Sequence, residues 1–414
     1  MTPLLFAATL ALSSSQRMHI DAIVERVMRE RHVAGLSLGI ARRGTPMYLR
    51  GYGLRDPSDR LPADGYTIYP IGSIAKQFAA ALVMHEVTAG RIALTNPVRS
   101  YVPAVSERLA AVTIAQALGQ TSGVAPAGDA TSAELAFDPG TAWSYSNANY
   151  ALLGMVLESV TGRTYAALLH DRIAVSLSLR STGCTVPAFA RNVARGYSWS
   201  DGWAPVATGL GASDDECSTA GLVSNAADLL RWLDGLRAAQ IVSAPALAAM
   251  TASGKLRNGI STHYGYGFFI SNWFGYAVAQ HPGYVGGFSS QDALVLDDGL
   301  EIAVLTNADA VDLTPLTKSL VAIVNPPRDR NLWATAAQAP ENENPRVTAA
   351  LQKAVGSPAY ASLGPLRSAE FIERSTVRGT TYDTYRLTFD AGQWWATVAY
   401  RHDESIDSLS LAPA

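Results

Sequence analysis

The stretch that most restricts how this chain can fold is an apolar run that opens with a serine and a lysine. After Lys76 and Gln77, every residue from Phe78 to Met84 is apolar, so a helix here is apolar on nearly all sides and must be buried. Ser73 and Lys76 are three residues apart, and residues with this spacing share one face of a helix. The fold therefore has to bury a helix whose first turn carries a hydroxyl and an amine side by side.

This S-x-x-K pair has a definite chemical use. A serine hydroxyl is a weak nucleophile until a base takes its proton, and a lysine desolvated in a pocket can lose its charge and act as that base. The free N–H groups at the start of a helix can also stabilise an oxyanion. The same tetrapeptide occurs where the serine only caps a helix and the lysine faces solvent, so other residues must decide.

Two later stretches complement this pair. Tyr145 and Asn147 form Y-x-N on a loop after Pro139-Gly140, just before a helix. His281 and Gly283 form H-x-G where a strand is expected to end. Each residue also has a plain structural interpretation, because Tyr145 could be a core aromatic and Asn147 a helix cap. The three motifs together indicate a site more strongly than any one of them.

With these motifs in this order, the chain resembles the penicillin-recognising serine hydrolases. Its closest branch is the class C β-lactamase-like group, which includes D-aminopeptidases, carboxylesterases and low-molecular-weight penicillin-binding proteins. The resemblance runs from about Ile20 to about Asn325. Further matching phrases are Leu118-Gly119-Gln120-Thr121-Ser122-Gly123, Tyr150-Ala151-Leu152-Leu153-Gly154, Thr161-Gly162-Arg163, Gly221-Leu222-Val223-Ser224 and Val304-Leu305-Thr306-Asn307.

The resemblance implies a role for each matched residue. Ser73 would attack an ester, amide or lactam carbonyl and form an acyl-enzyme. Lys76 and Tyr145 would handle the proton, and the sequence leaves open which of them is the general base. Asn147 would hydrogen-bond Lys76 and a substrate amide.

The resemblance also implies an oxyanion hole made of main-chain groups. The backbone N–H of Ser73 and that of Tyr284 would bind the oxyanion. Gly283, which lacks a side chain, would let the strand edge approach the substrate closely. Gly283 is therefore expected among the substrate-binding residues.

His281 departs from the β-lactamase pattern. The β-lactamases of this class have a lysine here, in K-T-G, that binds the substrate carboxylate. A histidine carries only part of a charge near neutral pH. His281 is expected either to bind substrate or merely to orient Tyr145, and the departure favours esterase or peptidase activity over β-lactamase activity.

The sequence therefore predicts a serine hydrolase with a small-molecule or peptide substrate, cell-wall peptides among the candidates. A second interpretation is a catalytically weak penicillin-binding, peptidoglycan-binding or regulatory protein with the same fold. That interpretation predicts a lost catalytic residue, whereas Ser73, Lys76, Tyr145 and Asn147 are all present. A formal net charge of -3 without a basic stripe argues against nucleic acid as a partner. The oligomeric state stays open.

The two cysteines allow two interpretations. Cys184 and Cys217 could form one disulfide in an exported chain, or they could be two small buried side chains. Neither cysteine has a spacing typical of zinc sites, so no metal is expected, and no cofactor is expected either.

Residues 1–16 are predicted to be an export signal. Leu4 to Leu12 is an apolar stretch, although Arg17 is the first basic residue. The alternative is a short hydrophobic arm that packs on the domain. The resemblance favours a periplasmic or secreted protein, and a cytoplasmic location stays open.

The periodicity of apolar residues predicts an α+β fold. A helix over Ile20–Met28 and then a hairpin turning at Arg43-Gly44 indicate an antiparallel sheet flanked by helices rather than βαβ units. A helical subdomain over about 94–210 is expected inside a hydrolase domain of residues 17–325, with the active site between subdomain and sheet.

A second region follows this hydrolase domain. Pro326-Pro327 opens a linker expected over 326–344. Residues 345–414 are expected to form a small α+β accessory domain, with a helix over 347–355 followed by strands.

Overall fold

The computed structural model describes residues 11–125, 130–207, 214–259 and 261–325, and four strands in the C-terminal part, 366–377, 380–389, 392–400 and 406–413. The chain divides into two compact units, residues 1–326 and 327–414.

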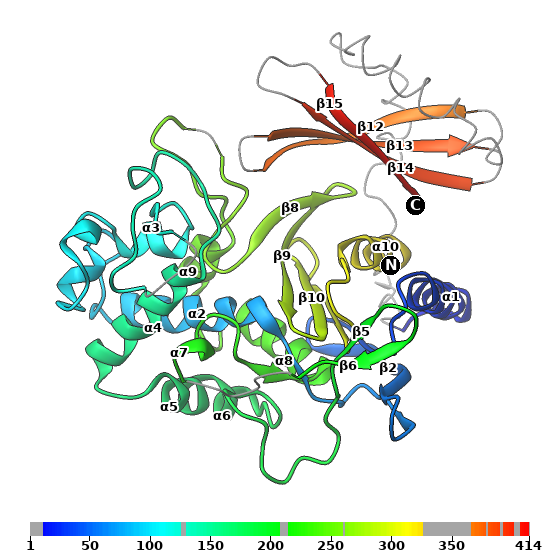
Figure 1. The fold of residues 1–414 in the computed structure, drawn as a ribbon, viewed down its shortest axis with the longest axis horizontal. Helices are drawn as coiled ribbons and strands as arrows, with labels where there is room; N and C mark the ends of the chain where they lie inside the picture. Colours follow the sequence, from blue (N-terminus) through cyan, green and yellow to red (C-terminus); the bar gives the residue numbers. More distant parts are fainter. Residues whose placement is uncertain are drawn as a thin grey trace, which may run out of the picture. The chain divides into compact units, whose positions relative to one another are not determined.

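An antiparallel sheet of seven strands forms the centre of the first unit (Figure 1). Strand β1 (Gly35–Arg42) pairs with the hairpin strand β2 (Thr45–Asp56) on one side and with β11 (Leu300–Thr306) on the other, so the beginning and the end of this unit meet in the middle of the sheet. This arrangement confirms the predicted antiparallel α+β fold. In spatial order the strands are β3 (Leu61–Pro62), β2 (Thr45–Asp56), β1 (Gly35–Arg42), β11 (Leu300–Thr306), β10 (Phe288–Val295), β9 (Tyr276–Val285) and β8 (Phe269–Trp273).

Two apolar cores lie on opposite faces of this sheet. Alternate residues of β1, such as Leu36 and Leu38, pack with α1 (Ser14–Glu30) and α10 (Thr314–Val324), which lie side by side in Figure 1. The other core contains α2 (Ala75–Thr88), the expected buried helix, and also α8 (Ala226–Arg237). The apolar run after Lys76 thus becomes the centre of the larger core.

Helices α3 (Ile114–Leu118) and α4 (Asn147–Thr161) lie within residues 94–210, where a helical subdomain is expected. Thr113 caps α3 with a capping box completed by Gln116, and α4 ends at Gly162, which has a left-handed backbone that favours glycine. The further helices of the described residues are α3 (Ile114–Leu118), α4 (Asn147–Thr161), α5 (Tyr165–Leu169), a π-helical turn (His170–Ala174), α6 (Val175–Leu177), α7 (Asp214–Cys217) and α9 (Ala244–Met250). Short strand pairs join β4 (Tyr69–Pro70) to β7 (Val223–Ser224) and β5 (Tyr197–Trp199) to β6 (Trp203–Pro205).

One expected strand is displaced. The sequence predicts a strand over Tyr266–Ile270, but β8 begins only at Phe269. The cause is Gly267, whose φ is +80° and whose Cα packs so tightly on α2 that a Cβ would lie 2.9 Å from the Lys76 carbonyl oxygen. The chain must therefore bend around the helix before it can join the sheet.

The described strands of the C-terminal unit form one antiparallel sheet. Its strands lie in the order β12 (Leu366–Val377), β13 (Thr380–Phe389), β14 (Gly392–Tyr400) and β15 (Ile406–Pro413). The linker expected over 326–344 and the helix expected over 347–355 lie outside the described residues, so the domain boundaries stay predictions.

The described chain begins with an ordered N-terminal helix. Ser13 caps α1 in a capping box with Gln16, and the buried Leu12 packs in the core. The export signal predicted over 1–16 overlaps the first turn of this helix; residues 1–10 lie outside the described part, and the signal stays a prediction. No helix among the described residues is long and apolar enough to span a bilayer.

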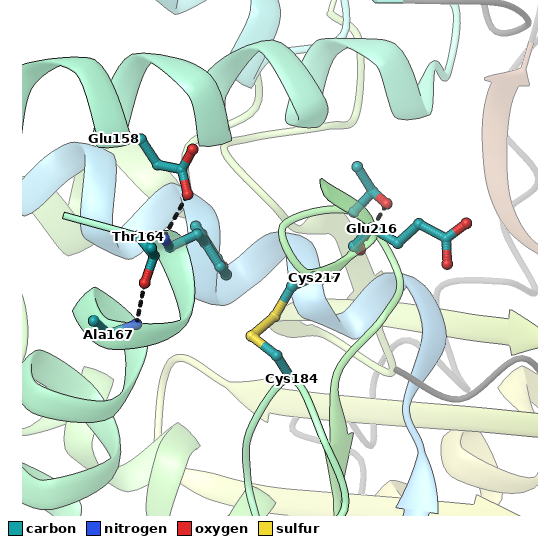
Figure 2. Close-up of a disulfide and its surroundings, with 8 residues drawn as sticks. Glu158, Thr164, Ala167, Cys184, Glu216 and Cys217 are labelled. Atoms are coloured by element: carbon teal, nitrogen blue, oxygen red, sulfur yellow. Dashed lines mark hydrogen bonds between the residues drawn. A yellow bond between two sulfur atoms is a disulfide. The ribbon is translucent and has the colours of Figure 1, made fainter. Parts of the chain in front are cut away.

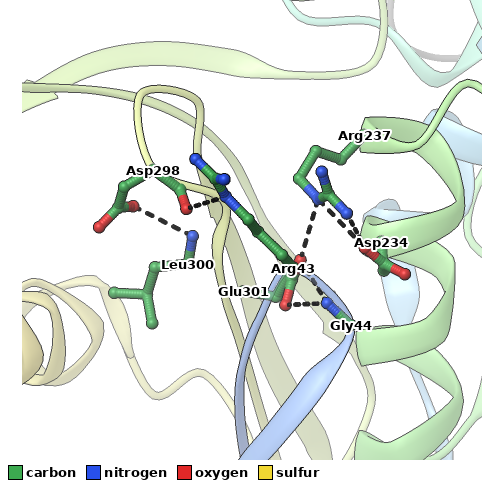
Figure 3. A network of polar contacts seen from close by, with 7 residues as sticks. All are labelled: Arg43, Gly44, Asp234, Arg237, Asp298, Leu300 and Glu301. Carbon is green, nitrogen blue, oxygen red and sulfur yellow. Dashed lines mark hydrogen bonds and ion pairs between the residues drawn. The ribbon is translucent and has the colours of Figure 1, made fainter. Parts of the chain in front are cut away.

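A buried carboxyl group lies where the hairpin, the sheet and α8 meet (Figure 3). The side chain of Glu301 is fully buried; its Oε1 and Oε2 accept from the Gly44 N–H at 3.3 and 3.4 Å, and Oε1 lies 3.6 Å from Arg237 Nε. Arg237 also binds Asp234 at 2.6 Å. Burial and the nearby Asp234 charge raise the pKa of Glu301 to about 7.

We expect Glu301→Gln to make unfolding less sensitive to pH. The raised pKa means that the folded state resists ionisation, so the native chain loses stability as the pH rises from 4.5 to about 7. Glutamine keeps an acceptor for Gly44 but cannot ionise. The free energy of unfolding of the variant, measured relative to that of the native chain, should therefore rise by up to about 3 kcal/mol across this range. Urea unfolding of both proteins at pH 5 and pH 8 tests this. If the free energies of unfolding of the variant and the native chain differ by the same amount at both pH values, the prediction is contradicted.

Candidate active site

The candidate nucleophile lies on a tight turn against the sheet. Ser73 is half-buried in the 3-10 turn Gly72–Ile74, which leads into α2. Gly72 has a φ of +52°, and a Cβ there would lie 2.6 Å from the backbone nitrogen of Tyr284. Only glycine permits this approach, which brings the backbone around Ser73 next to strand β9.

Lys76 is fully buried and contacts three different segments. Its Nζ lies 3.2 Å from the Ser73 Oγ, 2.7 Å from the Asn147 Oδ1 and 2.7 Å from the main-chain oxygen of Thr219. The first contact joins the 3-10 turn to the first turn of α2, as the S-x-x-K spacing predicts. The other two contacts come from α4 and from the segment after α7.

These contacts fix the direction of the amine lone pair. A neutral lysine has two N–H groups and one lone pair. The Asn147 and Thr219 oxygens are carbonyl oxygens and can only accept, so each takes an N–H. The Nζ also lies 3.2 Å from the Ser73 Oγ, to which the charged lysine donates; in the neutral amine the lone pair is left for this contact, and the hydroxyl can then donate to it. The arrangement is that of a base ready to take the serine proton.

The electrostatics favour Lys76 over Tyr145 as the general base. Burial lowers the pKa of Lys76 from 10.5 to about 7. Burial raises the pKa of Tyr145 well above its usual value, and the nearby Ser73 hydroxyl offsets this only in part. At neutral pH the phenol therefore keeps its proton while the lysine can lose its own.

Tyr145 is placed to move a proton. Its ring lies under the Lys76 ammonium position, 4.9 Å from Nζ to the ring centroid. Its buried hydroxyl has no partner with regular hydrogen-bond geometry among the described residues. A buried phenol that keeps its proton and lacks a partner can donate to a reacting group.

Asn147 serves Lys76 rather than the helix end. It is the first residue of α4, and the cap position belongs to Ser146, whose side chain makes no capping bond. The amide oxygen of Asn147 is bound to Lys76 instead. The alternative interpretation of Asn147 as only a helix cap is wrong.

Gln120, which has no expected role in the sequence beyond its place in the phrase Leu118 to Gly123, holds the Y-x-N loop. Its backbone oxygen accepts from the Ser144 N–H at 3.0 Å, and its side-chain oxygen accepts from the Ser146 N–H at 3.0 Å. These bonds grip the residues on both sides of Tyr145. Gln120 is fully buried with a φ of +61°. The sequence signal that could have indicated this role is a polar residue directly after the apolar end of α3.

The H-x-G strand approaches the Ser73 turn closely. A Cβ on Gly283 would lie 2.0 Å from the Ile71 backbone oxygen and 2.2 Å from the Ser290 Oγ, so only glycine fits. The next residue, Tyr284, places its backbone nitrogen beside Gly72. The structure thus brings together the two segments expected to form the oxyanion hole, and the hole itself stays a prediction.

His281 is buried and neutral. Its side chain is 1% exposed; Nδ1 donates to the Pro282 oxygen at 2.6 Å, and Nε2 lies 3.3 Å from the Tyr264 hydroxyl. Burial, and then the charge of Lys76, lower the pKa of His281 to about 3. The ring is buried in this conformation, and the substrate-binding role expected for it stays a prediction. Its ring packs near Tyr145 but makes no hydrogen bond to it within the described residues.

Aromatic rings surround this histidine. Tyr145, Tyr264 and Phe269 pack against one another, with centroid distances of 4.9 Å between Tyr264 and Phe269 and 6.3 Å between Tyr145 and Tyr264. Trp143 joins them at 5.8 Å from Tyr264. The His281 ring is therefore packed mainly among aromatic rings.

The cysteine pairing that the sequence left open is formed in the structure. Cys184 and Cys217 are joined by a disulfide (Figure 2). Cys217 ends α7, two residues before Thr219, which binds Lys76. The bond therefore lies close to the site along the chain.

Comparison with known proteins agrees with this geometry. A model of the β-lactamase family matches residues 20–323. The chain belongs to the β-lactamase family. The protein named flp from Staphylococcus aureus strain MW2 is 29% identical over 193 residues, 41% of this chain and 39% of that protein. A β-lactamase from Pseudomonas fluorescens is 27% identical over 233 residues, 53% of this chain and 64% of that protein. The matches thus span less than two thirds of either relative.

Solved structures share the fold. The octameric penicillin-binding protein homologue from Pyrococcus abyssi superposes with a TM-score of 0.67 at 21% identity, covering 96% of this chain and 98% of that chain. The D-amino acid amidase from Ochrobactrum anthropi SV3 gives 0.64 at 22% identity, covering 75% and 99%. Both show the α+β β-lactamase/transpeptidase fold.

We expect acylation of Ser73 to depend on pH with a midpoint near 7. Lys76 must be neutral to accept the serine proton, and below its pKa of about 7 it holds an extra proton instead. The rate of labelling by a fluorophosphonate probe, followed by intact-mass spectrometry, should rise between about pH 6 and 8. Ser73→Ala should show no adduct. A rate that rises only above pH 9 would exclude Lys76 as the base.

If Tyr145 moves a proton in the reaction, as the resemblance implies, Tyr145→Phe should slow turnover by about 10²-fold or more. Its free energy of unfolding should change by less than about 1 kcal/mol, since the hydroxyl has no regular hydrogen bond to lose in the described structure. Steady-state kinetics and urea unfolding measure both quantities.

Tyr150→Phe is the matched control. Its buried hydroxyl donates to the Leu118 oxygen at 2.9 Å, so this variant should lose about 1 kcal/mol of stability and keep most of its turnover. If Tyr145→Phe kept its turnover and Tyr150→Phe lost it, the role given to Tyr145 would be contradicted.

Proposed function

We propose that this protein is a serine hydrolase that forms an acyl-enzyme at Ser73 and acts on esters or on D-amino-acid amides and peptides in preference to β-lactams. The observation that carries the proposal is the buried Lys76 amine, whose Nζ lies within hydrogen-bond distance of two carbonyl oxygens and of the Ser73 Oγ. A structural lysine has no need of such an arrangement.

The geometry supports a two-step reaction. Lys76 takes the hydroxyl proton as the Ser73 Oγ bonds to the substrate carbonyl carbon, and the carbonyl oxygen becomes an oxyanion facing the N–H groups of Ser73 and Tyr284. The bond between the carbonyl carbon and the leaving group then breaks. The leaving group takes the proton that Lys76 received, and this proton passes through Tyr145. A water molecule then attacks the acyl-enzyme by the same route and releases Ser73.

The edge of β9 offers a place for an extended substrate. Strand β8 pairs with β9 from Trp273 opposite Tyr276 up to Phe269 opposite Gln280. Beyond Gln280 the strand continues to Gly283 and Tyr284, next to Ser73. A peptide-like substrate could lie along this edge and present its carbonyl to the serine.

The preference against β-lactams rests on position 281. A cation there would pair with the carboxylate of a β-lactam or of a peptide C-terminus. His281 is instead neutral and buried beneath Tyr264. The name of one structural neighbour, a D-amino acid amidase, is compatible with a substrate whose leaving group carries no charge.

We further propose that the protein works outside the reducing cytoplasm. The disulfide between Cys184 and Cys217 supports this, because such bonds persist in oxidising compartments. The apolar N-terminal stretch predicted as an export signal points the same way, and peptides of the cell wall are then candidate substrates.

A matched pair of substrates tests the proposal. We expect D-alanine p-nitroanilide to be cleaved, and the same anilide with a carboxylate on its ring to be cleaved with a kcat/KM at least about ten-fold lower, since no cation offsets the desolvation of that carboxylate. Ser73→Ala should cleave neither compound.

Faster cleavage of the carboxylated anilide would contradict the substrate preference. If neither anilide nor short-chain esters are cleaved and a fluorophosphonate leaves Ser73 unlabelled, the protein is a binding or regulatory member of the family instead.

A further inference from the structure

One of the two acceptors that orient Lys76 is a main-chain atom, and its position depends on how the chain around it is held. The Thr219 oxygen lies 2.7 Å from the Lys76 Nζ. Thr219 is only two residues from Cys217, which is 1% exposed and bonded to Cys184 (Figure 2). The disulfide thus lies two residues from the main-chain oxygen that accepts from Lys76.

The chain between Cys217 and Thr219 is a tight turn. The Glu216 carbonyl accepts from the N–H groups of Thr219, Ala220 and Gly221 at 3.0, 2.9 and 2.8 Å. The same carbonyl accepts from the Thr219 hydroxyl at 2.9 Å. A displacement of Cys217 would therefore be passed on to the Thr219 oxygen.

The other half of the disulfide is anchored to the nucleophile segment. Gly183, next to Cys184, exchanges two backbone hydrogen bonds with Val223, at 2.9 and 3.2 Å. Val223 pairs in turn with Pro70, on the strand that leads to Ser73. The disulfide therefore connects the turn that holds Lys76 to the strand that leads to Ser73.

The turn also packs on the helix that carries the second acceptor. A Cβ on Gly154 of α4 would lie 2.7 Å from the Ser218 Oγ, so the two segments are in close contact. Asn147 begins the same helix. Both acceptors of Lys76 thus belong to segments that meet at this turn.

We propose that the Cys184–Cys217 disulfide is a positioning device for the general base: it holds the Thr219 oxygen against Lys76, so that efficient acylation of Ser73 requires the oxidised enzyme. This inference rests on the proposed serine hydrolase mechanism. It adds a dependence of that mechanism on the redox state of two residues that do not touch the substrate.

The physical expectation follows from the hydrogen bonds of the amine. With the Thr219 oxygen free to move, one N–H of Lys76 loses its fixed acceptor and the lone pair is no longer held toward Ser73. Water can then enter the site, and because burial is what lowers the pKa of Lys76, hydration moves that pKa back up. Among the described residues, Tyr145 and Tyr150 place their rings against Lys76, and His281 lies close enough for the Lys76 charge to lower its pKa.

Reduction of the native enzyme tests the inference directly. The phosphine TCEP breaks the S–S bond to give two thiols while its phosphorus is oxidised to the phosphine oxide with an oxygen from water. The chain has only two cysteines, so no other bond is affected. The rate of fluorophosphonate labelling is then measured from pH 6 to 9 on oxidised, reduced and reoxidised protein, with circular dichroism to confirm the fold.

We expect the reduced enzyme to be labelled about 10 to 100 times more slowly at pH 7, part of the ~10²–10⁴-fold that a positioned base contributes. The acid limb of its pH profile should move to higher pH, and reoxidation should restore both. Cys184→Ser with Cys217→Ser should behave like the reduced enzyme. Leu320→Ala, in the core on the opposite face of the sheet, should lower the melting temperature without slowing labelling.

Equal labelling rates and the same acid limb in folded oxidised and reduced protein would overturn the inference, because the disulfide would then only stabilise the fold. Slowing by Leu320→Ala to the same extent would overturn it as well. Absence of labelling in the oxidised enzyme would overturn the proposed function, and this inference with it.

Discussion

The contact on which this structure depends is the one between a buried lysine amine and the serine beside it. An ammonium group without solvent is costly, and a buried lysine stays charged only if its partners compensate. Lys76 has carbonyl and hydroxyl oxygens around it but no carboxylate among its described partners. Its burial therefore favours the neutral amine, which is the form that can accept a proton from Ser73.

A second buried network holds α2, the helix that carries Lys76, against strand β9, which carries the H-x-G motif. Gln77, next to Lys76, donates to the Asp292 Oδ1 at 2.8 Å, and the His281 backbone N–H donates to the same oxygen at 3.1 Å. The Trp232 indole in turn donates to Gln77. Burial raises the pKa of Asp292 to about 7. One carboxyl group thus joins α2, β9 and β10, and it fixes the distance between Ser73 and the H-x-G strand.

A family relative carries the name β-lactamase, and a solved structure with the same fold carries the name D-amino acid amidase. Such differences arise in the site rather than in the scaffold. At position 281, where the β-lactamases that the chain resembles have a lysine, this chain has a buried histidine beside Tyr264. The proposed nucleophile Ser73 and base Lys76 are both present, so the proposal places the difference in the substrate rather than in the chemistry.

The sequence by itself determined the local features. The three-residue spacing of Ser73 and Lys76, the alternation in β1 and the capping at Thr113 act over a few residues, so their outcome can be predicted from neighbours alone. The tertiary structure decided everything that depends on distant partners. No residue type marks the Thr219 main-chain oxygen as an acceptor, and nothing local to His281 shows that it is buried, because both depend on segments far apart in sequence that meet only when the sheet and the helical subdomain have packed together.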